Sequence, residues 1–290
     1  MDCLKISDNL NNRDGVSFSM KRSPYVRTKI VGGYEPYKDK NGITQFGEVV
    51  FETENMIVLG GSLFTLEKVF GVKSPINIRD LRDIMSLPSN DTPITNNKDT
   101  YVCLFGVGTG GAGESITDVK DVEYYEDGIY DMVPFRQTDS ELTYEDSLKY
   151  FFKKPITVNI DGGQISKTAY YLKRFETNPE IHVLWRDAEG DEDGSEVGDD
   201  VHATPSSNVT PIETFIELTL KITKNDVREF FDDNGNVEAA RINSIGLFTG
   251  VKNDADDDYQ QIKLFSKLNI NNEILVLAKD LTISYRIYTS

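Results

Sequence analysis

Residues 215–222 of this chain read Phe215-Ile216-Glu217-Leu218-Thr219-Leu220-Lys221-Ile222, so apolar and polar side chains alternate along them. The chain closes on a second stretch with the same alternation, Leu281-Thr282-Ile283-Ser284-Tyr285-Arg286-Ile287-Tyr288. A period of two is typical of an antiparallel strand that turns one face to a core and the other to water. We therefore expect Glu217, Thr219 and Lys221 to face water, and the last strand to be held within a sheet.

Other short segments of strand character lie between and before these two stretches, separated by turn-forming residues such as Asp233-Asn234-Gly235. Short strands with turn signals between them predict an antiparallel β-sandwich or jelly-roll-like domain at the C-terminal end. A hairpin is expected around Gly162, and a few short helices make the whole chain mainly β, of the α+β class. The further strand candidates cover residues 47–53, 56–59, 101–105, 156–160, 170–175, 181–185, 241–248 and 262–270.

Three helices are expected from apolar spacing and from capping residues. The first begins after Ser62 and ends at Gly71, with Leu63, Leu66, Val69 and Phe70 turned inward. The second covers residues 78–87. The third follows Asp139 and Ser140, ends at Pro155 and turns one apolar face inward, made of Tyr144, Leu148, Phe151 and Phe152.

The polarity of the chain suggests three parts. Residues 1–41 are polar and form either an irregular leader or an extended arm onto an acidic neighbour, residues 42–155 form a mixed α+β part, and residues 156–290 form the sandwich-like part. An acidic loop at residues 187–208 interrupts the last part. In the arm, a small basic cluster is the candidate interface, made of Lys21, Arg22, Arg27 and Lys29.

The composition restricts the function. Of 290 residues, 31 are basic and 48 acidic, which gives a formal charge of −17 and argues against binding a nucleic-acid backbone. Such a surface suits contacts with basic patches on a protein partner. Cys3 and Cys103 form no disulfide framework and read as reduced thiols of a protein made in the cytosol. Without an apolar run for a signal peptide or a bilayer span, we expect no membrane association.

A run of glycines follows the strand at residues 101–105 and has the spacing of a dinucleotide-binding fingerprint. The residues after it lack the apolar face of the helix that such a site requires. A flexible connector or a contact loop is therefore expected instead, with an interface role for Gly106, Gly108, Gly110, Gly111 and Gly113.

No catalytic, cofactor or metal residues are predicted. His182 lies among apolar strand residues and is expected to be a core histidine with its hydrogen bonds satisfied, while His202 lies in the acidic loop. Neither has a Cys or His partner at the spacing of a zinc site. The acidic residues from Glu189 to Asp200 resemble a calcium loop, but the flanking helices are missing and a solvated charge run is favoured. The acidic tip at residues 254–258 has the same interpretation.

Several local patterns resemble those of structural proteins from tailed bacteriophages. They are Glu54-Asn55-Met56-Ile57-Val58-Leu59-Gly60-Gly61 leading into Leu66-Glu67-Lys68-Val69-Phe70, Met132-Val133-Pro134-Phe135-Arg136, Ile242-Asn243-Ser244-Ile245-Gly246-Leu247-Phe248 and the C-terminal strand. These are short motifs of moderate specificity, spread from about residue 48 onward. The resemblance implies a virion component, assembled in the host cytoplasm, without catalytic residues or cofactors.

Within that class we expect a neck or collar subunit that forms a ring with copies of itself and contacts other virion proteins. An acidic inner surface would let DNA pass without adhering, because like charges repel. A baseplate or tail-tip protein, a capsid decoration protein and a carbohydrate-binding sandwich that uses Trp185 and the tyrosines remain as alternatives, in that order.

Overall fold

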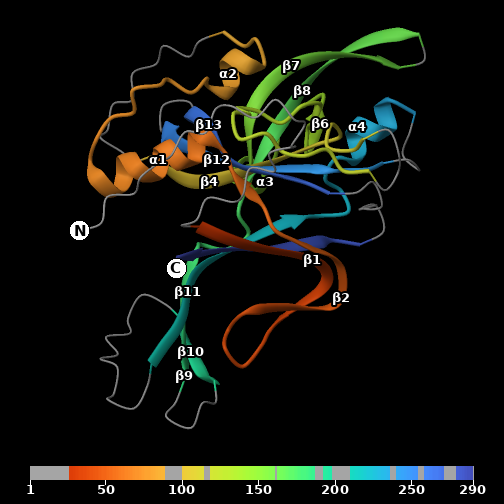
Figure 1. Cartoon of the computed structure of the whole chain (residues 1–290). Helices are drawn as coiled ribbons and strands as arrows, with labels where there is room; N and C mark the ends of the chain where they lie inside the picture. The colour runs from red at the N-terminus through yellow and green to blue at the C-terminus, as the bar shows by residue number, and fades with distance from the viewer. Residues whose placement is uncertain are drawn as a thin grey trace, which may run out of the picture.

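Two antiparallel sheets form the body of the molecule, as a computed structural model shows (Figure 1). The structure describes residues 26–88, 100–113, 118–160, 162–186, 192–197, 210–235, 240–253, 258–270 and 279–289. The prediction of a mainly β chain with a few short helices is confirmed. The sandwich is not confined to the C-terminal part, however, because both sheets also contain strands from the first half of the chain.

In the described residues the first sheet has six strands, and the C-terminal strand lies in its middle rather than at an edge. In spatial order the strands are β10 (Glu192–Val197), β9 (Glu180–Arg186), β11 (Thr210–Ile222), β14 (Leu281–Thr289), β1 (Val26–Lys38) and β2 (Thr44–Thr53). The alternating stretches at residues 215–222 and 281–288 lie in β11 and β14, which pair from Phe215 with Tyr288 to Ile222 with Leu281. The expectation that the last strand is held within a sheet is confirmed.

The second sheet has eight strands in the part of the chain that the structure describes. Its main path runs β3 (Met56–Ile57), β13 (Asp258–Asn269), β12 (Ser244–Asn253), β4 (Tyr101–Gly108), β8 (Gly163–Arg174) and β6 (Arg136–Thr138), while β5 (Met132–Val133) pairs with β4 and β7 (Tyr150–Ile160) with β8. The predicted hairpin around Gly162 is the β7–β8 connection, and it extends well beyond the rest of the sheet (Figure 1).

The main core lies between the two sheets. Leu220 and Tyr285 of the first sheet belong to the same buried cluster as Phe105, Leu247 and Phe265 of the second. Burying apolar side chains from both inner faces stabilises a sandwich and fixes the strand register. A second cluster lies on the opposite face of the eight-stranded sheet, and it includes Leu104, Phe151, Phe152, Leu172, Phe248 and Tyr259.

Four helices accompany the sheets in the described residues: α1 (Leu59–Phe70), α2 (Leu81–Ile84), α3 (Tyr144–Ser147) and α4 (Arg228–Asp233). Gly71 ends α1 as predicted, in the left-handed conformation with φ 64° that glycine adopts without strain. The start was misplaced, because the N-cap is Val58 and not Ser62. Of the second predicted helix only the single turn Leu81–Ile84 is helical, and the Asp80 side chain caps it.

The third predicted helix is wrong. Only residues Tyr144–Ser147 are helical, and Phe151 and Phe152 lie in strand β7, paired with β8 across a buried face. Spacings of four, seven and eight residues suit a helix, but aromatic and β-branched side chains also suit a strand, and pairing with β8 decides between them. Pro155 is tolerated there because β7 pairs with β8 alone, so its second edge needs no backbone donor.

Three further expectations are corrected. Residues 26–38 are not part of an irregular arm but form β1, whose Ile30 lies in the main core. Part of the acidic loop, residues 192–197, forms strand β10 against β9. The proposed part boundary at residue 155 falls inside β7.

Candidate functional site

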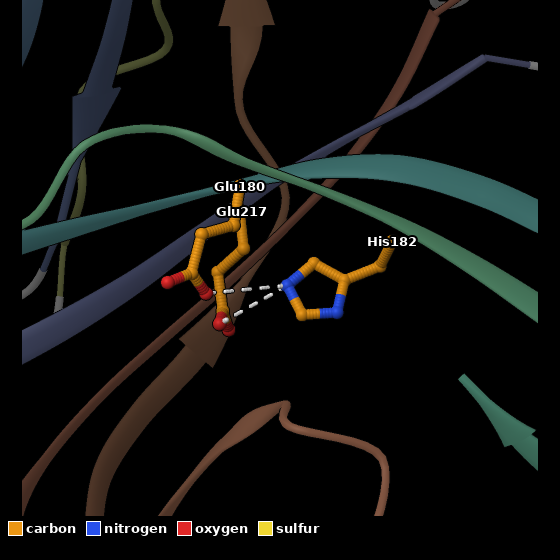
Figure 2. A group of neighbouring side chains, drawn as sticks. All are labelled: Glu180, His182 and Glu217. Atoms are coloured by element: carbon orange, nitrogen blue, oxygen red, sulfur yellow. Dashed lines mark ion pairs between the residues drawn. The ribbon is translucent and has the colours of Figure 1, made fainter. Parts of the chain in front are cut away.

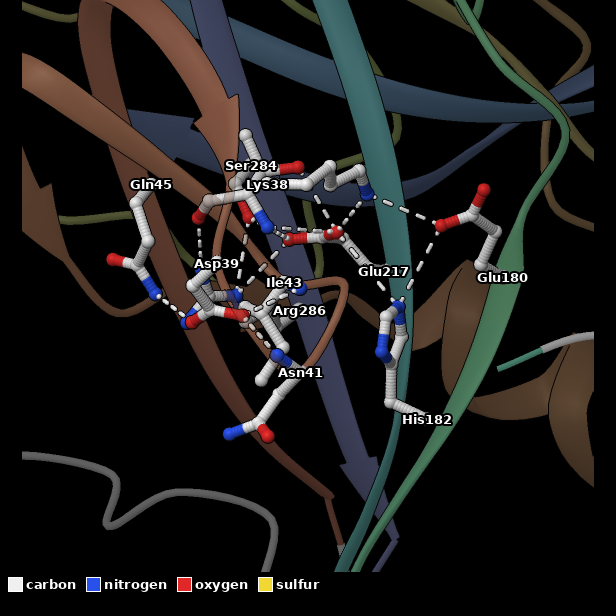
Figure 3. A network of polar contacts seen from close by, with 11 residues as sticks. Lys38, Asp39, Asn41, Ile43, Gln45, Glu180, His182, Glu217, Ser284 and Arg286 are labelled. Atoms are coloured by element: carbon white, nitrogen blue, oxygen red, sulfur yellow. Dashed lines mark hydrogen bonds and ion pairs between the residues drawn. The ribbon is translucent and has the colours of Figure 1, made fainter. Parts of the chain in front are cut away.

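A cluster of charged and polar side chains lies on the outer face of the six-stranded sheet, opposite to the face on which Leu218 and Leu220 enter the main core. Figures 2 and 3 show its side chains from close by. We call it the outer-face cluster, and its members are Lys38, Thr44, Glu180, His182, Glu217, Ser284 and Arg286. Strand register explains the grouping, since Glu217 of β11 stands opposite both Glu180 of β9 and Arg286 of β14. His182 lies two residues beyond Glu180 and therefore projects from the same face.

The connection between β1 and β2 folds over this face and covers it. Asp39 organises the turn, because its Oδ1 accepts hydrogen bonds from the backbone N–H groups of Asn41 and Ile43. Ile43 then packs in a small apolar cluster with Phe215 and Tyr288. The turn thereby removes from water side chains that the alternation of β11 and β14 alone would leave exposed.

Glu217 is the centre of the cluster and is buried, contrary to the expectation that it faces water. Its Oε1 accepts from Ser284 Oγ at 2.6 Å and from Arg286 Nε at 3.3 Å. Its Oε2 accepts from Thr44 Oγ1 at 3.0 Å and from Lys38 Nζ at 2.9 Å. Although burial opposes ionisation, these hydrogen bonds and the charges of Lys38 and Arg286 hold the pKa of Glu217 below its usual value.

Lys38 bridges the two carboxylates of the cluster. Its Nζ lies 2.9 Å from Glu217 Oε2 and 3.1 Å from Glu180 Oε2, and 44% of its side chain is exposed. Although partial burial opposes protonation, the two carboxylates raise the pKa of Lys38, so the ammonium stays charged. Lys38 and Glu180 therefore form the solvent side of the cluster, while Glu217 and His182 form its buried side.

His182 is fully buried, as predicted, but it is not satisfied. Neither ring nitrogen has a hydrogen-bond partner among the described residues, and Nε2 lies 3.7 Å from Glu180 Oε2 and 3.8 Å from Glu217 Oε2. Its ring stacks on Phe215 with centroids 4.9 Å apart and an interplanar angle of 5°. Burial lowers the pKa of His182, so the neutral imidazole with a free nitrogen lone pair is the form favoured near neutral pH.

The sequence contained one signal for this cluster. Glu180 and His182 stand two apart in a strand, and Glu217 lies on the polar side of the alternation in β11, so the two glutamates can meet only if β9 and β11 are neighbours. That pairing, like the covering turn, depends on contacts distant in sequence. The strands were therefore predictable, whereas the cluster was not.

A second surface feature is the outward face of α1. Leu66, Val69 and Phe70 are 50%, 66% and 67% exposed, so the inward face predicted for this helix is wrong. The helix approaches the sheet through Gly60 and Gly61 instead, where a methyl group on Gly61 would stand 2.0 Å from the Phe265 carbonyl oxygen. Close backbone contact at the first turn leaves the C-terminal half of α1 to turn its apolar side chains to solvent.

The segment after α1 extends this apolar surface. Val72 and Ile76 are also more than half exposed, and we call the five residues Leu66, Val69, Phe70, Val72 and Ile76 the α1 apolar face. A groove of about 660 Å³ runs beside it, and its charged lining residues are three lysines and one glutamate, Lys68, Lys73, Lys263 and Glu67. The face therefore has basic neighbours, on a chain whose net charge is −17.

Of the four basic residues predicted to form an interface, two lie outside the described residues and two form ion pairs within the chain. Lys21 and Arg22 lie outside the described residues. Arg27 pairs with Glu213 at 2.7 Å and lies over the Tyr288 ring, and Lys29 pairs with Glu52 at 2.8 Å. These two residues are thus engaged within the chain, and a role for them in an interface stays a prediction.

The glycine run is not a flexible connector. Gly106 and Gly108 belong to strand β4, and Gly110 and Gly111 are buried beyond its end, where the Gly111 N–H donates to Asn243 Oδ1 at 2.7 Å. Side chains and backbone pack against all four, so in this structure they offer no surface to a partner. Gly113 is half-buried.

The other residues singled out in the sequence are either buried or outside the described residues. Cys103 is free and buried in β4. Asp258 is a buried acceptor for the Phe152 backbone N–H at 2.9 Å rather than part of an exposed tip. Cys3, His202, the other acidic residues at 254–257, most of the calcium-like segment and the side chain of Trp185 lie outside the described residues. No helix among the described residues is long and apolar enough to cross a membrane. No protein-family model, curated protein or solved structure matches this chain.

Proposed function

We propose that this chain is a non-enzymatic structural subunit of a tailed-phage particle, and that it forms a ring at the neck or collar by docking onto copies of itself. The motifs that resemble those of tailed-phage structural proteins suggest the class of particle, and the mainly β sandwich suits a subunit that works through its surfaces. The observation that carries the proposal is the α1 apolar face. Soluble monomers rarely expose contiguous apolar patches of this kind unless a partner covers them.

Charge favours a second copy as the occupant of this face. Lys68, Lys73 and Lys263 border the face or its groove, whereas the chain as a whole carries 17 more acidic than basic residues. An acidic surface elsewhere on a second copy complements this local basic border. Two different surfaces in contact make a head-to-tail interface, which closes into a ring when the rotation between copies allows it.

The proposal is tested by the mass of the purified full chain across a range of concentrations, using sedimentation and negative-stain electron microscopy. We expect a closed oligomer that dissociates in the double variant Val69→Ser, Phe70→Ser. Ile165→Ser, on the distant β7–β8 hairpin and 41% exposed, is the matched control and should leave the oligomer intact. Circular dichroism shows whether each variant is folded.

A chain that stays monomeric at all concentrations contradicts self-assembly. The position in the particle is a separate question, which antibody labelling of purified virions answers. Label at the head–tail junction supports the neck, label at the tail tip or capsid surface supports the other virion roles, and absence from virions contradicts the class.

A further inference from the structure

The outer-face cluster contains a set of atoms suited to a metal ion. Glu180 Oε2, His182 Nε2 and Glu217 Oε2 converge so that all three lie within 4.8 Å of one another (Figure 2). A tetrahedral Zn²⁺ site with bonds of about 2.0–2.1 Å places neighbouring ligand atoms about 3.3 Å apart. The distances from Nε2 to the carboxylates, 3.7 and 3.8 Å, are close to that value, so small side-chain rotations suffice.

The buried histidine is the observation that points to a ligand. A buried imidazole normally uses at least one nitrogen in a hydrogen bond, because an unpaired buried polar group is costly. Within the part of the chain that the structure describes, His182 uses neither, and its Nε2 faces the two carboxylates (Figure 2). Donating a lone pair to an ion between the carboxylates would satisfy this nitrogen.

The position between the carboxylates already suits a cation, since the Lys38 ammonium lies there (Figure 3). Lys38 is half-exposed at the end of β1, so its flexible side chain can move into solvent while the rest of the cluster stays in place. An incoming ion therefore competes with a tethered ammonium group, and removal of that group should strengthen binding.

The buried ligands are held in position by their neighbours. Ser284 and Arg286 engage Glu217 Oε1, while Oε2 is held by Thr44 Oγ1 at 3.0 Å and lies beside Lys38 Nζ and His182 Nε2. The Phe215 ring fixes the plane of the imidazole by stacking. Such supporting contacts orient ligands in protein metal sites and contribute to affinity.

We propose that Glu180, His182 and Glu217 form a binding site for a divalent transition-metal ion of the Zn²⁺ class, with Lys38 as the competing cation of the metal-free state. One imidazole nitrogen and two carboxylate oxygens are a ligand set that Zn²⁺ accepts, whereas Ca²⁺ and Mg²⁺ prefer oxygen ligands alone. The ion joins β9 to β11 and stabilises the folded chain, because the ligands come together only there.

The test is titration of the full chain with Zn²⁺ by calorimetry and by competition with a chromophoric chelator. Glu180→Gln keeps the shape of a partly exposed side chain and should weaken binding about tenfold or more. Lys38→Met removes the competitor and should strengthen binding by about tenfold, with a larger rise of the melting temperature in Zn²⁺ than for the unchanged chain. Glu52→Gln, an exposed carboxylate paired with Lys29, is the matched control and should bind as the unchanged chain does.

Two results would overturn the proposal. One is the absence of Zn²⁺ binding to Lys38→Met at millimolar concentration. The other is binding that Glu180→Gln and Lys38→Met leave within about twofold of the unchanged chain, which would place the ion elsewhere. His182→Phe keeps an aromatic ring that can stack on Phe215 but removes the nitrogen ligand. The visible spectrum of bound Co²⁺ should therefore differ between this variant and the unchanged chain.

Discussion

At the scale of single residues, Glu217 is the buried carboxylate shared by Lys38 and Arg286. Replacement by Gln leaves the charges of Lys38 and Arg286 without their shared buried partner, so we expect the free energy of unfolding to fall by about 3–5 kcal/mol. Chemical denaturation measures the loss. Glu52→Gln removes an exposed carboxylate of the same chemistry and should cost less than about 1 kcal/mol. Equal losses for the two variants would contradict the central role of Glu217.

Cys103 gives a prediction at alkaline pH. Burial raises the pKa of its thiol to about 12, above the ordinary value near 9. Between pH 9 and pH 12 the folded chain keeps a thiol proton that the unfolded chain releases. The stability that the buried, neutral thiol contributes is therefore complete below pH 9 and is lost as pH rises toward 12. Burial also raises the pKa of Tyr259 and Tyr285, which adds to the loss above the ordinary pKa of tyrosine.

Denaturation midpoints at neutral pH and near pH 10.5 measure this effect. In a Cys3→Ser background, replacing Cys103 by Ala should reduce the fall in stability between these pH values by about 1–2 kcal/mol. If the fall in stability is the same with and without Cys103, the thiol has the same pKa in the folded and unfolded states. The native Cys103 thiol should also react with a thiol reagent only after unfolding, since its side chain is buried.

At the scale of elements, the docking of α1 depends on the absence of a side chain at Gly61. In Gly61→Ala the added methyl group would stand 2.0 Å from the Phe265 carbonyl oxygen, so helix and strand must separate. We expect a loss of about 2–3 kcal/mol in the free energy of unfolding, despite the better helix propensity of alanine. Gly163→Ala meets no atom closer than 3.5 Å and should change stability little. Thermal melts of both variants provide the comparison.

Elements were predictable where the local pattern has a single interpretation. The alternation of β11 and β14 specifies a strand with one buried face, and glycine at position 71 specifies the end of α1. Residues 144–152 have two interpretations, since their apolar spacing fits a helix and their side chains fit a strand. Contacts with residues distant in sequence decide between helix and strand there, and such contacts also bury Glu217 and leave Val69 exposed. Local patterns therefore indicated most strands, while the candidate site required the tertiary arrangement.

At the scale of the whole molecule, the order of strands joins the two ends of the described chain. Strand β14 lies between β11 and β1, and Ile30 of β1 stands opposite Tyr285 of β14. The six-stranded sheet is therefore incomplete until the last residues are present. Pairings so distant in sequence require closure of long loops and favour slow folding.

A chain that ends at Ile270 provides a direct test of this dependence. Without β14, strands β1 and β11 lose their shared partner and the inner face loses Leu281, Ile283 and Tyr285, all of which are buried in the main core. Losses of several large core side chains exceed the usual stability of a domain, so we expect no cooperative thermal transition by circular dichroism. Removal of Ser290 alone is the control and should leave the transition intact. Addition of a peptide with the sequence of residues 279–290 should restore the transition if the missing strand is the cause. A cooperative transition in the shortened chain without the peptide would mean that the sheet forms without its central strand, contrary to the pairing observed.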